Sequence, residues 1–563
     1  MIQNLNKLVK TYRHINRYRE IIYVLGRHGF GDFLSNLKLE KYLNIGGKMF
    51  KGGNYGKVSN LTRWERIRMV LEELGPTFIK FGQLMSNRPD LLPQPLLAEL
   101  EKLQDTVPPF STEKAKSCVE DELGESITGL FKEFTDKPVA CGSIAQVHKV
   151  ILNNGENAVL KIQRPGIEKV IEVDLEIMLH ISLLMEKYVT GLDIINPVGI
   201  VNEFEKSITR ELDFTREAAH IERTRNNFKD DETIYIPKVY KEFTTKKIIS
   251  LEFIDGIKVS NINDLLDTGK DISTVTKRII DLVLKQIFAH GFFHADPHAG
   301  NIFVLGDNVI CFLDFGMTGV LLPSQRECLG NIVIGVVKND PKIIIKALIQ
   351  LTHGKRISDI EQFEYQISEL LDSYSYISLK EINIGEFINE IISVVIKHKL
   401  QIPTNIYLMS KALLSMESVI RKLDPEFNLI ENVKSFAGKI ARENLNPYNL
   451  SKKFYISLIE LSLFMRDLPV QVNELFEQAR LGRFSVKFEH KGLESMLQVH
   501  DRISNRIAFS IVLASLVMGS SLIVLSGVPP VWHGIPVIGL LGFLGACVMG
   551  FWLLISIMRH GKI

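Results

Sequence analysis

The chain has 563 residues, of which 46% are hydrophobic, and its formal net charge is +2 at pH 7. This length exceeds one compact domain, so about two to four units are expected. The composition excludes a disordered chain, and the near-neutral charge argues against nucleic acid as a partner. The five cysteines show no CxxC or Cys/His spacing, which predicts a reducing compartment and no zinc site.

The first stretch, residues 1–60, is basic and helix-like. Apolar side chains recur there every three or four positions, between arginines. Such a helix either lies on an anionic membrane surface or packs on its own protein, and the second reading is favoured. Because charge interrupts every apolar run, the segment is not a secretory signal.

A helical extension is predicted over residues 61–133. Gly75-Pro76 separates two helical stretches, with Pro76 in a first turn. The second stretch carries Lys80 and Gln83 on one face, one turn apart, and Gly82 would permit close approach of another element. Taken alone, the Lys80 and Gln83 face also fits a solvated surface.

Residues 134–260 change to a strand-like pattern. Strands are predicted at Ser143–Leu152 and Asn157–Ile162, joined by a turn over 153–155. Lys161 lies inside the second apolar strand, where an ammonium is costly unless it meets anions. It is either an edge-strand lysine that points to water, or a kinase-type lysine that binds nucleotide phosphates and a helix glutamate.

Protein kinases place a glycine-rich loop over the phosphates, before the strand that carries the lysine. Here that position holds Ala140, Cys141, Gly142 and Ser143. Fewer glycines predict a stiffer loop and a different nucleotide pose.

One regular helix is predicted over 198–228, and it carries Glu211, Asp213 and Glu217. Asp213 and Glu217 would lie one turn apart on one face, with Glu211 on the other side. The three carboxylates therefore cannot all serve one cation, and Lys161 and Lys80 are the expected partners.

The chain then reads as a hinge followed by a large lobe over 261–345. A strand in 248–259 runs into a turn at Asp255-Gly256, so Glu252 to Ile254 would present backbone to an adenine. A helix from Ser273 to His290 leads to the next motif.

The sequence from His294 to Gly316 has the pattern of a phosphoryl-transfer site. Asp296 would face the acceptor, while Asn301 and Asp314 would hold Mg²⁺. Two short apolar strands with a tight turn between them would bring Asn301 and Asp314 to one metal. An alternative is a metal cluster of His294, Asp296 and His298.

The C-terminal part predicts a helical extension over 346–500 and a transmembrane hairpin over 505–560. The uncharged apolar runs 507–525 and 535–558 are each long enough to span a bilayer. Lys and Arg flank the outer ends and are missing from the connecting segment, which puts both ends in the cytoplasm. Small residues repeat every four positions in both runs and fit either close helix contact, within the hairpin or in a homodimer, or a face turned to lipid.

The motifs together resemble the UbiB/AarF family of atypical kinases, from about residue 60 onward. The residues that carry this resemblance are Lys80-Phe81-Gly82-Gln83, Ala140 to His148, Lys161 to Gly166, Glu211-Leu212-Asp213-Phe214, His294-Ala295-Asp296-Pro297-His298 and Asp314-Phe315-Gly316. The resemblance implies that Lys80 sits over the active site, held by Glu211 and Asp213, and that Lys161 pairs with Glu217. The family's loop is typically Ala-Ala-Ala-Ser, from which Cys141 and Gly142 depart.

The expected fold is α+β: a two-lobed, protein-kinase-like fold with an N-terminal helical extension, a C-terminal helical region and a two-helix transmembrane hairpin. The resemblance further implies ATP and Mg²⁺ as cofactors, membrane association and support of ubiquinone or other prenyl-lipid biosynthesis, with prenylated quinone precursors and quinone-biosynthesis proteins as partners. Two alternatives stay open, a small-molecule phosphotransferase of the aminoglycoside or choline kinase type and a nucleotide-gated scaffold without catalysis.

Overall fold

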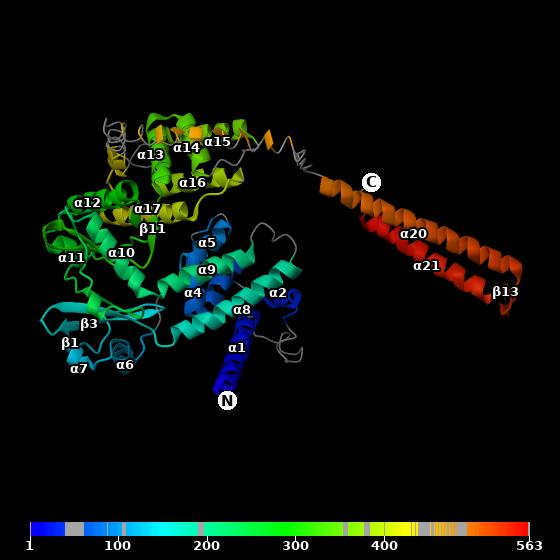
Figure 1. Cartoon of the computed structure of the whole chain (residues 1–563), viewed down its shortest axis with the longest axis horizontal. Coiled ribbons are helices and arrows are strands. Elements are labelled where there is room, and N and C mark those ends of the chain that lie inside the picture. The colour runs from blue at the N-terminus through cyan, green and yellow to red at the C-terminus, as the bar shows by residue number, and fades with distance from the viewer. Residues whose placement is uncertain are drawn as a thin grey trace. The chain divides into compact units, whose positions relative to one another are not determined.

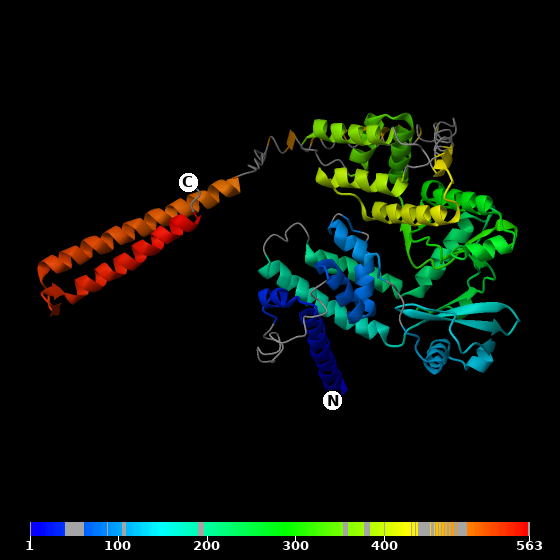
Figure 2. The same cartoon turned by 180° about the vertical axis from the view of Figure 1, so that it is seen from behind.

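The computed structural model of this chain forms two compact units, Met1–Leu450 and Ser451–Ile563 (Figures 1 and 2). The described residues are 2–39, 61–103 without 87 and 90, 108–189, 196–352, 359–375, 383–398, 400–429, 431–436 without 434, scattered positions between 451 and 480, and 493–560.

The N-terminal helices pack on the remainder of the first unit. In α1 (Ile2–Arg27), Ile21 and Ile22 are buried, and the Arg17 guanidinium donates a 2.7 Å hydrogen bond to the buried Asp174 of α8 (Ile167–Tyr188). The described part of α1 therefore packs on its own protein, as favoured from the sequence. The other helices of this region are α2 (Gly31–Asn36), α3 (Arg63–Leu74), α4 (Pro76–Met85) and α5 (Gln94–Leu100).

The boundary between α3 and α4 lies where the sequence places it. Thr62 and Glu65 form a capping box at the start of α3, which satisfies backbone donors there. Gly75 ends α3 with a φ of +90°, a value that favours glycine, and Pro76 begins α4.

The small lobe is built on a five-stranded antiparallel sheet in the order β1-β3-β4-β6, with β2 paired to β3. Lys161 lies opposite Val147 of β3 and Ile249 of β6, so its strand is central and the edge-strand reading is wrong. Leu160 and Ile162 pack toward α6 (Thr112–Leu123), so Lys161 faces the other side of the sheet. The strands are β1 (Phe131–Phe134), β2 (Ala140–Cys141), β3 (Ala145–Leu152), β4 (Asn157–Gln163) and β6 (Ile248–Glu252), and the short helix α7 (Ile127–Leu130) precedes them.

The large lobe places two short sheets beside a buried helix. The helix predicted from Ser273 is α12 (Ile272–Leu284), capped by Asp271 and continued by a π-helical turn, Lys285–His290. One sheet has the order β5-β10-β9-β7, and β8 pairs with β11. These elements are β5 (Ile234–Tyr235), η3 (Lys241–Phe243), β7 (Ile257–Lys258), α11 (Ile262–Asp267), β8 (Phe292–His294), β9 (Ile302–Val304), η5 (Gly306–Asn308), β10 (Ile310–Phe312) and β11 (Thr318–Val320).

The first four of the helices that follow form a core of their own around Phe363, which is completely buried, whereas the buried apolar side chains of the fifth belong mainly to the main core. They are α13 (Pro323–Lys338), α14 (Pro341–Leu351), α15 (Ile360–Ser375), α16 (Ile384–Lys397) and α17 (Thr404–Leu423). The last of them, α17, also packs against α12 and β11, so the helical region reaches the large lobe.

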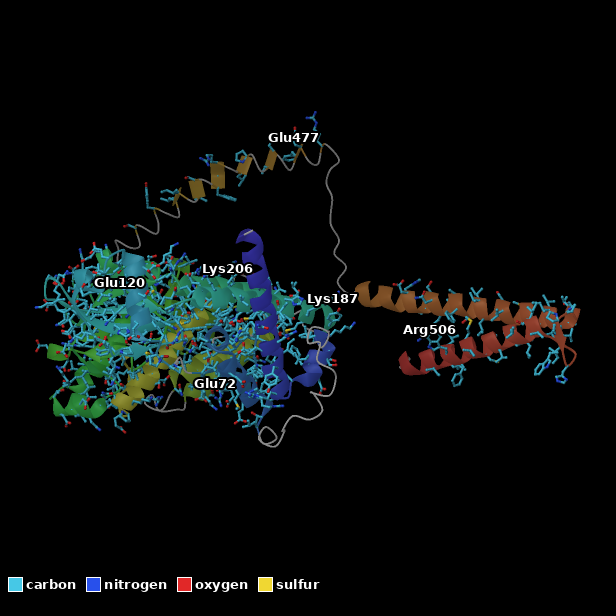
Figure 3. The ribbon with its side chains drawn as sticks, turned by 90° about the horizontal axis from the view of Figure 1, so that it is seen from below. Glu72, Glu120, Lys187, Lys206, Glu477 and Arg506 are labelled. Carbon is cyan, nitrogen blue, oxygen red and sulfur yellow. The ribbon has the colours of Figure 1, made fainter. Side chains whose placement is uncertain are left out.

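The second unit contains two long apolar helices, α20 (Leu493–Ser526) and α21 (Val537–His560), which pack side by side as a hairpin (Figure 1). Ile503–Ser526 and Val537–Ile555 are long and apolar enough to cross a membrane, each with a mean hydropathy of 2.3. Figure 3 shows their side chains projecting outward along both helices. The two-strand ribbon β12 (Val531–Trp532) and β13 (Ile535–Pro536) joins them.

Small residues hold the two hairpin helices close together. A Cβ atom at Gly542 would lie 2.1 Å from the Ser520 Oγ, and Ala546 is 5% exposed. A Cβ atom added at Gly519 would have no neighbour within 4 Å, so Gly519 is not part of this contact. The small residues of the second run therefore serve the hairpin itself.

Candidate active site

The centre of the site is the ammonium of Lys161, which contacts two carboxylates. Its Nζ lies 2.9 Å and 3.0 Å from the oxygens of Glu217 on α10 (Phe214–Asn227), and 3.0 Å from Oδ1 of Asp314. The Glu217 side chain is 5% exposed, whereas that of Asp314 is 53% exposed. The structure therefore brings together the three residues that the sequence placed around the phosphates, and Asp314 keeps an accessible face.

Burial and charge set the protonation of this cluster. Burial alone would lower the pKa of Lys161, but the charges of Asp314 and Glu217 raise it above its ordinary value. The Lys161 charge holds the pKa of Asp314 well below its usual range. Burial raises the pKa of Glu217 to about 7, with the Lys161 charge opposing the rise and the Asp314 charge adding to it. Lys161 thus stays charged, and Asp314 is the carboxylate that stays ionised beside it.

The helix predicted over 198–228 is two helices, which corrects the sequence reading. α9 (Pro197–Glu211) ends before Leu212, and Asp213 is the N-cap of α10, where its carboxylate accepts the Thr215 N–H at 3.2 Å. An N-cap aspartate has a non-helical backbone conformation, in which its side chain accepts a backbone N–H of the first helical turn. One continuous helix therefore cannot run through Asp213. Glu211 and Glu217 consequently lie on different helices rather than on opposite sides of one.

The two lysines divide these carboxylates as the family resemblance implies. Lys80 of α4 lies 2.6 Å from Oε1 of Glu211, while Lys161 takes Glu217. The Lys80 charge also helps to lower the pKa of Asp314, after the larger effects of Lys161 and His294. The N–H and the hydroxyl of Thr215 both donate to Oδ1 of Asp213. The part of Asp213 in holding Lys80 therefore stays a prediction.

Gly82 and Gln83 fix α4 in this position. The Gln83 amide donates to the Leu103 carbonyl at 3.3 Å. A Cβ atom at Gly82 would lie 2.3 Å from Cδ1 of Leu103 and 2.9 Å from Cδ1 of Leu71, so the close approach expected from the sequence is present. Neither Lys80 nor Gln83 forms a merely solvated face, since the Lys80 side chain is 14% exposed.

Replacing Gly82 with leucine is expected to lower the free energy of unfolding by about 1–3 kcal/mol, because the added side chain overfills the contact with Leu71 and Leu103. Heat unfolding followed by circular dichroism measures this loss. The control is Gly142→Ala, because the added Cβ would meet only the Ala145 carbonyl, at 3.7 Å. Gly124 is less suitable, since its φ of +76° would strain any other residue although an added Cβ there would have nothing within 4 Å. Equal unfolding midpoints for Gly82→Leu and Gly142→Ala would contradict the packing argument.

The loop after β8 is held by the imidazole of His294, which is 2% exposed. Its Nδ1 accepts the Asp296 N–H at 3.1 Å, so its Nε2 carries the proton and donates to the Leu313 carbonyl at 3.0 Å. Burial lowers the pKa of His294, which keeps the ring neutral. His294 therefore joins the backbone of Asp296 to the residue before Asp314.

The hairpin predicted between Asn301 and Asp314 is present. β9 and β10 pair in antiparallel register, and the Leu313 N–H donates to the Asn301 carbonyl at 2.8 Å. Asn301 and Asp314 are thus at the same end of the hairpin, where an amide and a carboxylate oxygen could hold Mg²⁺. Among the residues that the structure describes, no group of three His, Cys, Asp or Glu side chains could hold a metal, so the alternative cluster at His294, Asp296 and His298 is not found.

The loop that would cover the phosphates is short and partly buried. Gly142 donates its N–H to the Ala145 carbonyl at 2.8 Å, and the predicted strand begins at Ala145 rather than at Ser143. Ser143 is completely buried, and its hydroxyl has no hydrogen-bond partner among the described residues. An orphaned buried hydroxyl is costly, so this loop fits a polar group such as a phosphate oxygen close by. Burial raises the pKa of Cys141, so its thiol stays protonated.

Two backbone N–H groups of the predicted hinge already form hydrogen bonds within the protein, which the sequence does not indicate. The N–H groups of Glu252 and Phe253 donate to the carbonyls of Lys238 and Asn157 at 2.9 Å and 3.1 Å. These two donors are therefore used within the protein, and Ile254 remains the predicted adenine-facing backbone.

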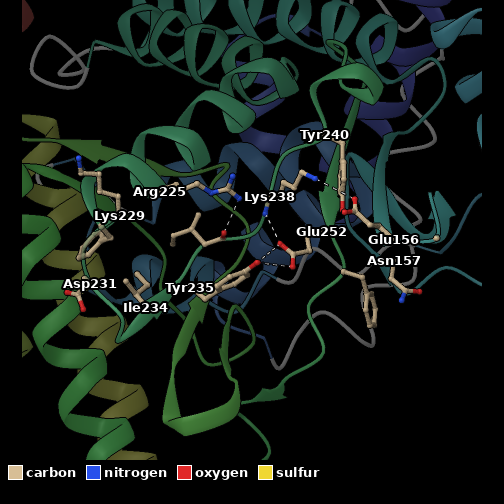
Figure 4. A pocket seen from close by; sticks show the side chains of 14 residues that line it. Glu156, Asn157, Arg225, Lys229, Asp231, Ile234, Tyr235, Lys238, Tyr240 and Glu252 are labelled. Carbon is tan, nitrogen blue, oxygen red and sulfur yellow. Dashed lines mark hydrogen bonds and ion pairs between the residues drawn. The ribbon is translucent and has the colours of Figure 1, made fainter. Parts of the chain in front are cut away.

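A pocket of about 720 Å³ lies behind this hinge and was not foreseen (Figure 4). The Glu252 carboxylate points into it and accepts the Tyr235 hydroxyl at 2.8 Å and 2.9 Å. Glu252 stands three residues from Ile249, the partner of Lys161 in β4, so the two side chains project from opposite faces of the sheet. The pocket is thus separate from the lysine cluster.

One further side chain near the site had no sequence signal. Lys411 of α17 places its Nζ 3.5 Å from Oδ2 of Asp296. A single lysine on an amphipathic helix is ordinarily a surface residue, so only the tertiary structure identifies it.

Three family models match the chain: the ABC1 atypical kinase-like domain over residues 102–348, the UbiB helical domain over 367–428 and the ABC1/UbiB kinase-like C-terminal domain over 491–559. An uncharacterized protein in the hydrogenase 1 5′ region of Clostridium pasteurianum is 33% identical over 98% of this chain and 100% of its own. A probable protein kinase UbiB from Marinobacter nauticus is 34% identical over 75% of this chain and 78% of its own.

Among solved structures, the Rv3197–erythromycin complex from Mycobacterium tuberculosis matches 60% of this chain and 92% of that chain, at 22% identity and a TM-score of 0.40. The α+β, kinase-like fold expected from the sequence is confirmed by the family models and by the described helices and sheets. The chain belongs to the ABC1/UbiB family of atypical kinase-like proteins.

Proposed function

We propose that this chain is a membrane-anchored atypical kinase or ATPase that uses ATP with Mg²⁺ and supports the biosynthesis of ubiquinone or a related prenyl lipid. The observation that carries the proposal is the contact of one partly buried ammonium, that of Lys161, with both Glu217 and Asp314. Kinase-type sites need this arrangement to orient the nucleotide phosphates beside a metal-binding carboxylate.

Each residue has a separate part in the proposed reaction. Lys161, held by Glu217, orients the phosphates, and Asn301 and Asp314 supply oxygen ligands of the kind that Mg²⁺ prefers. Asp296 orients the acceptor hydroxyl or water and takes its proton as the γ-phosphoryl group passes from ATP to the acceptor oxygen, with ADP as the leaving group. When bound, Mg²⁺ would neutralise charge on the phosphate oxygens.

The N-terminal extension favours a small acceptor or water over a protein substrate. Lys80 of α4 lies 2.6 Å from Glu211, and the family resemblance implies that this lysine sits over the active site, where it would limit the approach of a protein substrate. The aminoglycoside and choline kinase relatives of this fold would not be expected to carry Lys80 and Gln83 or the apolar hairpin. These features favour a membrane ATPase or lipid-directed kinase over a soluble small-molecule phosphotransferase.

The membrane part of the proposal rests on the two apolar helices of the second unit, and the kinase part is supported by the names of the relatives. Prenylated quinone precursors dissolve in the membrane, and a hairpin anchor would keep the enzyme at the surface of that membrane. Relatives from Marinobacter and Pseudomonas carry the name probable protein kinase UbiB.

The direct test is ATP turnover by the purified full-length chain. We expect Mg²⁺-dependent phosphate release that rises in the presence of lipid vesicles or a prenylphenol analogue. ATP binding without turnover under any of these conditions would favour the nucleotide-gated scaffold. Turnover that occurs only with an aminoglycoside or choline would favour the soluble phosphotransferase.

The hairpin is proposed to leave both of its ends in the cytoplasm, because Arg502, Arg506, Arg559 and Lys562 flank it and the connecting segment lacks Lys and Arg. In a chain whose native cysteines are replaced, Ser526→Cys is expected to react with a membrane-impermeant maleimide added to intact cells. His500→Cys should react only after the cells are lysed. Labelling of His500→Cys in intact cells would show that the hairpin has the opposite orientation.

A further inference from the structure

Lys411 connects the C-terminal helical region to the catalytic loop. Its Nζ lies 3.5 Å from Oδ2 of Asp296, and the two side chains are 28% and 35% exposed. None of the sequence motifs includes this lysine. The contact joins α17 to a loop that begins more than one hundred residues earlier in the chain.

The helix that carries Lys411 is firmly anchored. The Asn405 amide donates to the Val320 carbonyl at 2.8 Å and to the Gln325 side chain at 2.7 Å. On either side of Lys411, Ser410 and Ala412 are 4% and 0% exposed. The backbone at Lys411 is therefore fixed, and its side chain enters the site from a rigid support.

The same ammonium also acts electrostatically on a second carboxylate, that of Glu101. Glu101 follows α5 in the N-terminal extension; burial raises its pKa, and the Lys411 charge opposes that rise. Lys411 thus contacts Asp296 of the catalytic loop, and its charge also acts on Glu101 of the extension.

The cations on the nucleotide side cannot take this part. Lys161 is engaged by Glu217 and Asp314, and Lys80 is engaged by Glu211. Two positions after Asp296 the chain has His298, whose Nδ1 accepts the Gly300 N–H at 3.1 Å. Among the described residues, the cation in contact with the Asp296 carboxylate is Lys411 of α17.

We propose that Lys411 is a positioning residue for Asp296, holding one carboxylate oxygen so that the other faces the acceptor. This inference rests on the proposed ATP turnover. It assigns the helical region a direct part in the reaction, since the orientation of the catalytic carboxylate then depends on where α17 sits. A displaced carboxylate slows proton transfer without weakening nucleotide binding.

The experiment measures kcat and KM for ATP in the full-length chain, in wild type, Lys411→Met, Lys411→Arg and Lys411→Gln. Lys411→Met and Lys411→Gln are expected to lower kcat by about 10- to 100-fold with KM within about threefold. Lys411→Arg, which keeps the charge, should retain about a third of kcat or more. Lys422→Met, an exposed lysine of the same helix, is the matched control and should match wild type.

A double-variant comparison separates positioning from a general structural effect. In an Asp296→Asn background, Lys411→Met should cost less than about twofold in residual kcat, because the group it positions is gone. A full further loss in that background would overturn the inference. A raised KM with unchanged kcat would overturn it as well, since Lys411 would then bind nucleotide directly.

The outcome also distinguishes the two levels of the argument. If wild type shows no turnover with any acceptor, the proposed function fails. If wild type turns over ATP and Lys411→Met matches it, only the part assigned to Lys411 fails.

Discussion

Replacing Asp314 with asparagine is expected to lower ATP turnover by about 10²- to 10³-fold while leaving the fold intact. The side chain keeps its size but loses the charge that would bind the metal. Lys161 still has Glu217 at 2.9 Å, so the small lobe keeps its main ion pair. Asp314 has a φ of +58°, a conformation that asparagine adopts readily, so the substitution adds no backbone strain.

Phosphate release by the purified chain measures this effect, with circular dichroism as the check on folding. Asp307→Asn is a matched control, because Asp307 lies in the turn of the same hairpin, is exposed and has a φ of +53°. It should leave turnover unchanged. Turnover by Asp314→Asn within about threefold of wild type would remove Asp314 from the catalytic assignment.

Replacing Lys161 with methionine is expected to abolish turnover and to lower the free energy of unfolding at pH 8 by about 3–5 kcal/mol. The cause is Glu217, which is 5% exposed and would be left as a buried charge next to Asp314 without a cation. Unfolding by urea, followed by circular dichroism at pH 5 and pH 8, measures the loss.

The pH dependence has a definite sign. The pKa of Glu217 in the folded chain is about 7, above its ordinary 4.5, so its stabilising contribution is present below about 4.5 and is lost as pH rises through 7. Without the opposing Lys161 charge this pKa rises further, so Lys161→Met should recover stability at pH 5. Asp314, whose pKa is held below its ordinary 3.8, contributes its stability above that value and is not affected between pH 5 and pH 8.

Glu217→Gln provides the control for this argument. In the double variant with Lys161→Met, the buried carboxylate is gone, so most of the loss at pH 8 should disappear. An equal loss at pH 5 and pH 8, or no recovery in the double variant, would show that the destabilisation of Lys161→Met does not come from Glu217.

The sequence predicts the parts of the site that are set by local spacing. Asn301 and Asp314 are joined by a short hairpin, and Lys161 lies in an apolar strand, so periodicity alone places them. Spacing along the chain indicates only that the carboxylates are divided between Lys80 and Lys161, and the family resemblance implies which lysine takes which carboxylate. The helix that was assumed is interrupted at Asp213. The apolar stripe along 198–228 predicts one continuous helix, whereas the capping hydrogen bond of Asp213 begins a new one. In a sequence, the apolar stripe is the stronger of these two signals.

The remaining features depend on long-range contacts. Lys411 reaches Asp296 only because α17 packs against α12 and β11, and nothing in the residues around it marks that approach. The pocket behind the hinge likewise forms where Tyr235 and Glu252 meet across a loop. Neither arrangement has a period or a spacing that a sequence displays.

The ion pairs of this site leave it short of positive charge. Three lysines, at 80, 161 and 411, contact four carboxylates, those of Glu211, Glu217, Asp296 and Asp314. A triphosphate brought to this cleft would meet more repulsion than attraction from the protein alone. Its affinity should therefore depend steeply on the divalent cation that accompanies it, and chelation should release the nucleotide before it unfolds the chain.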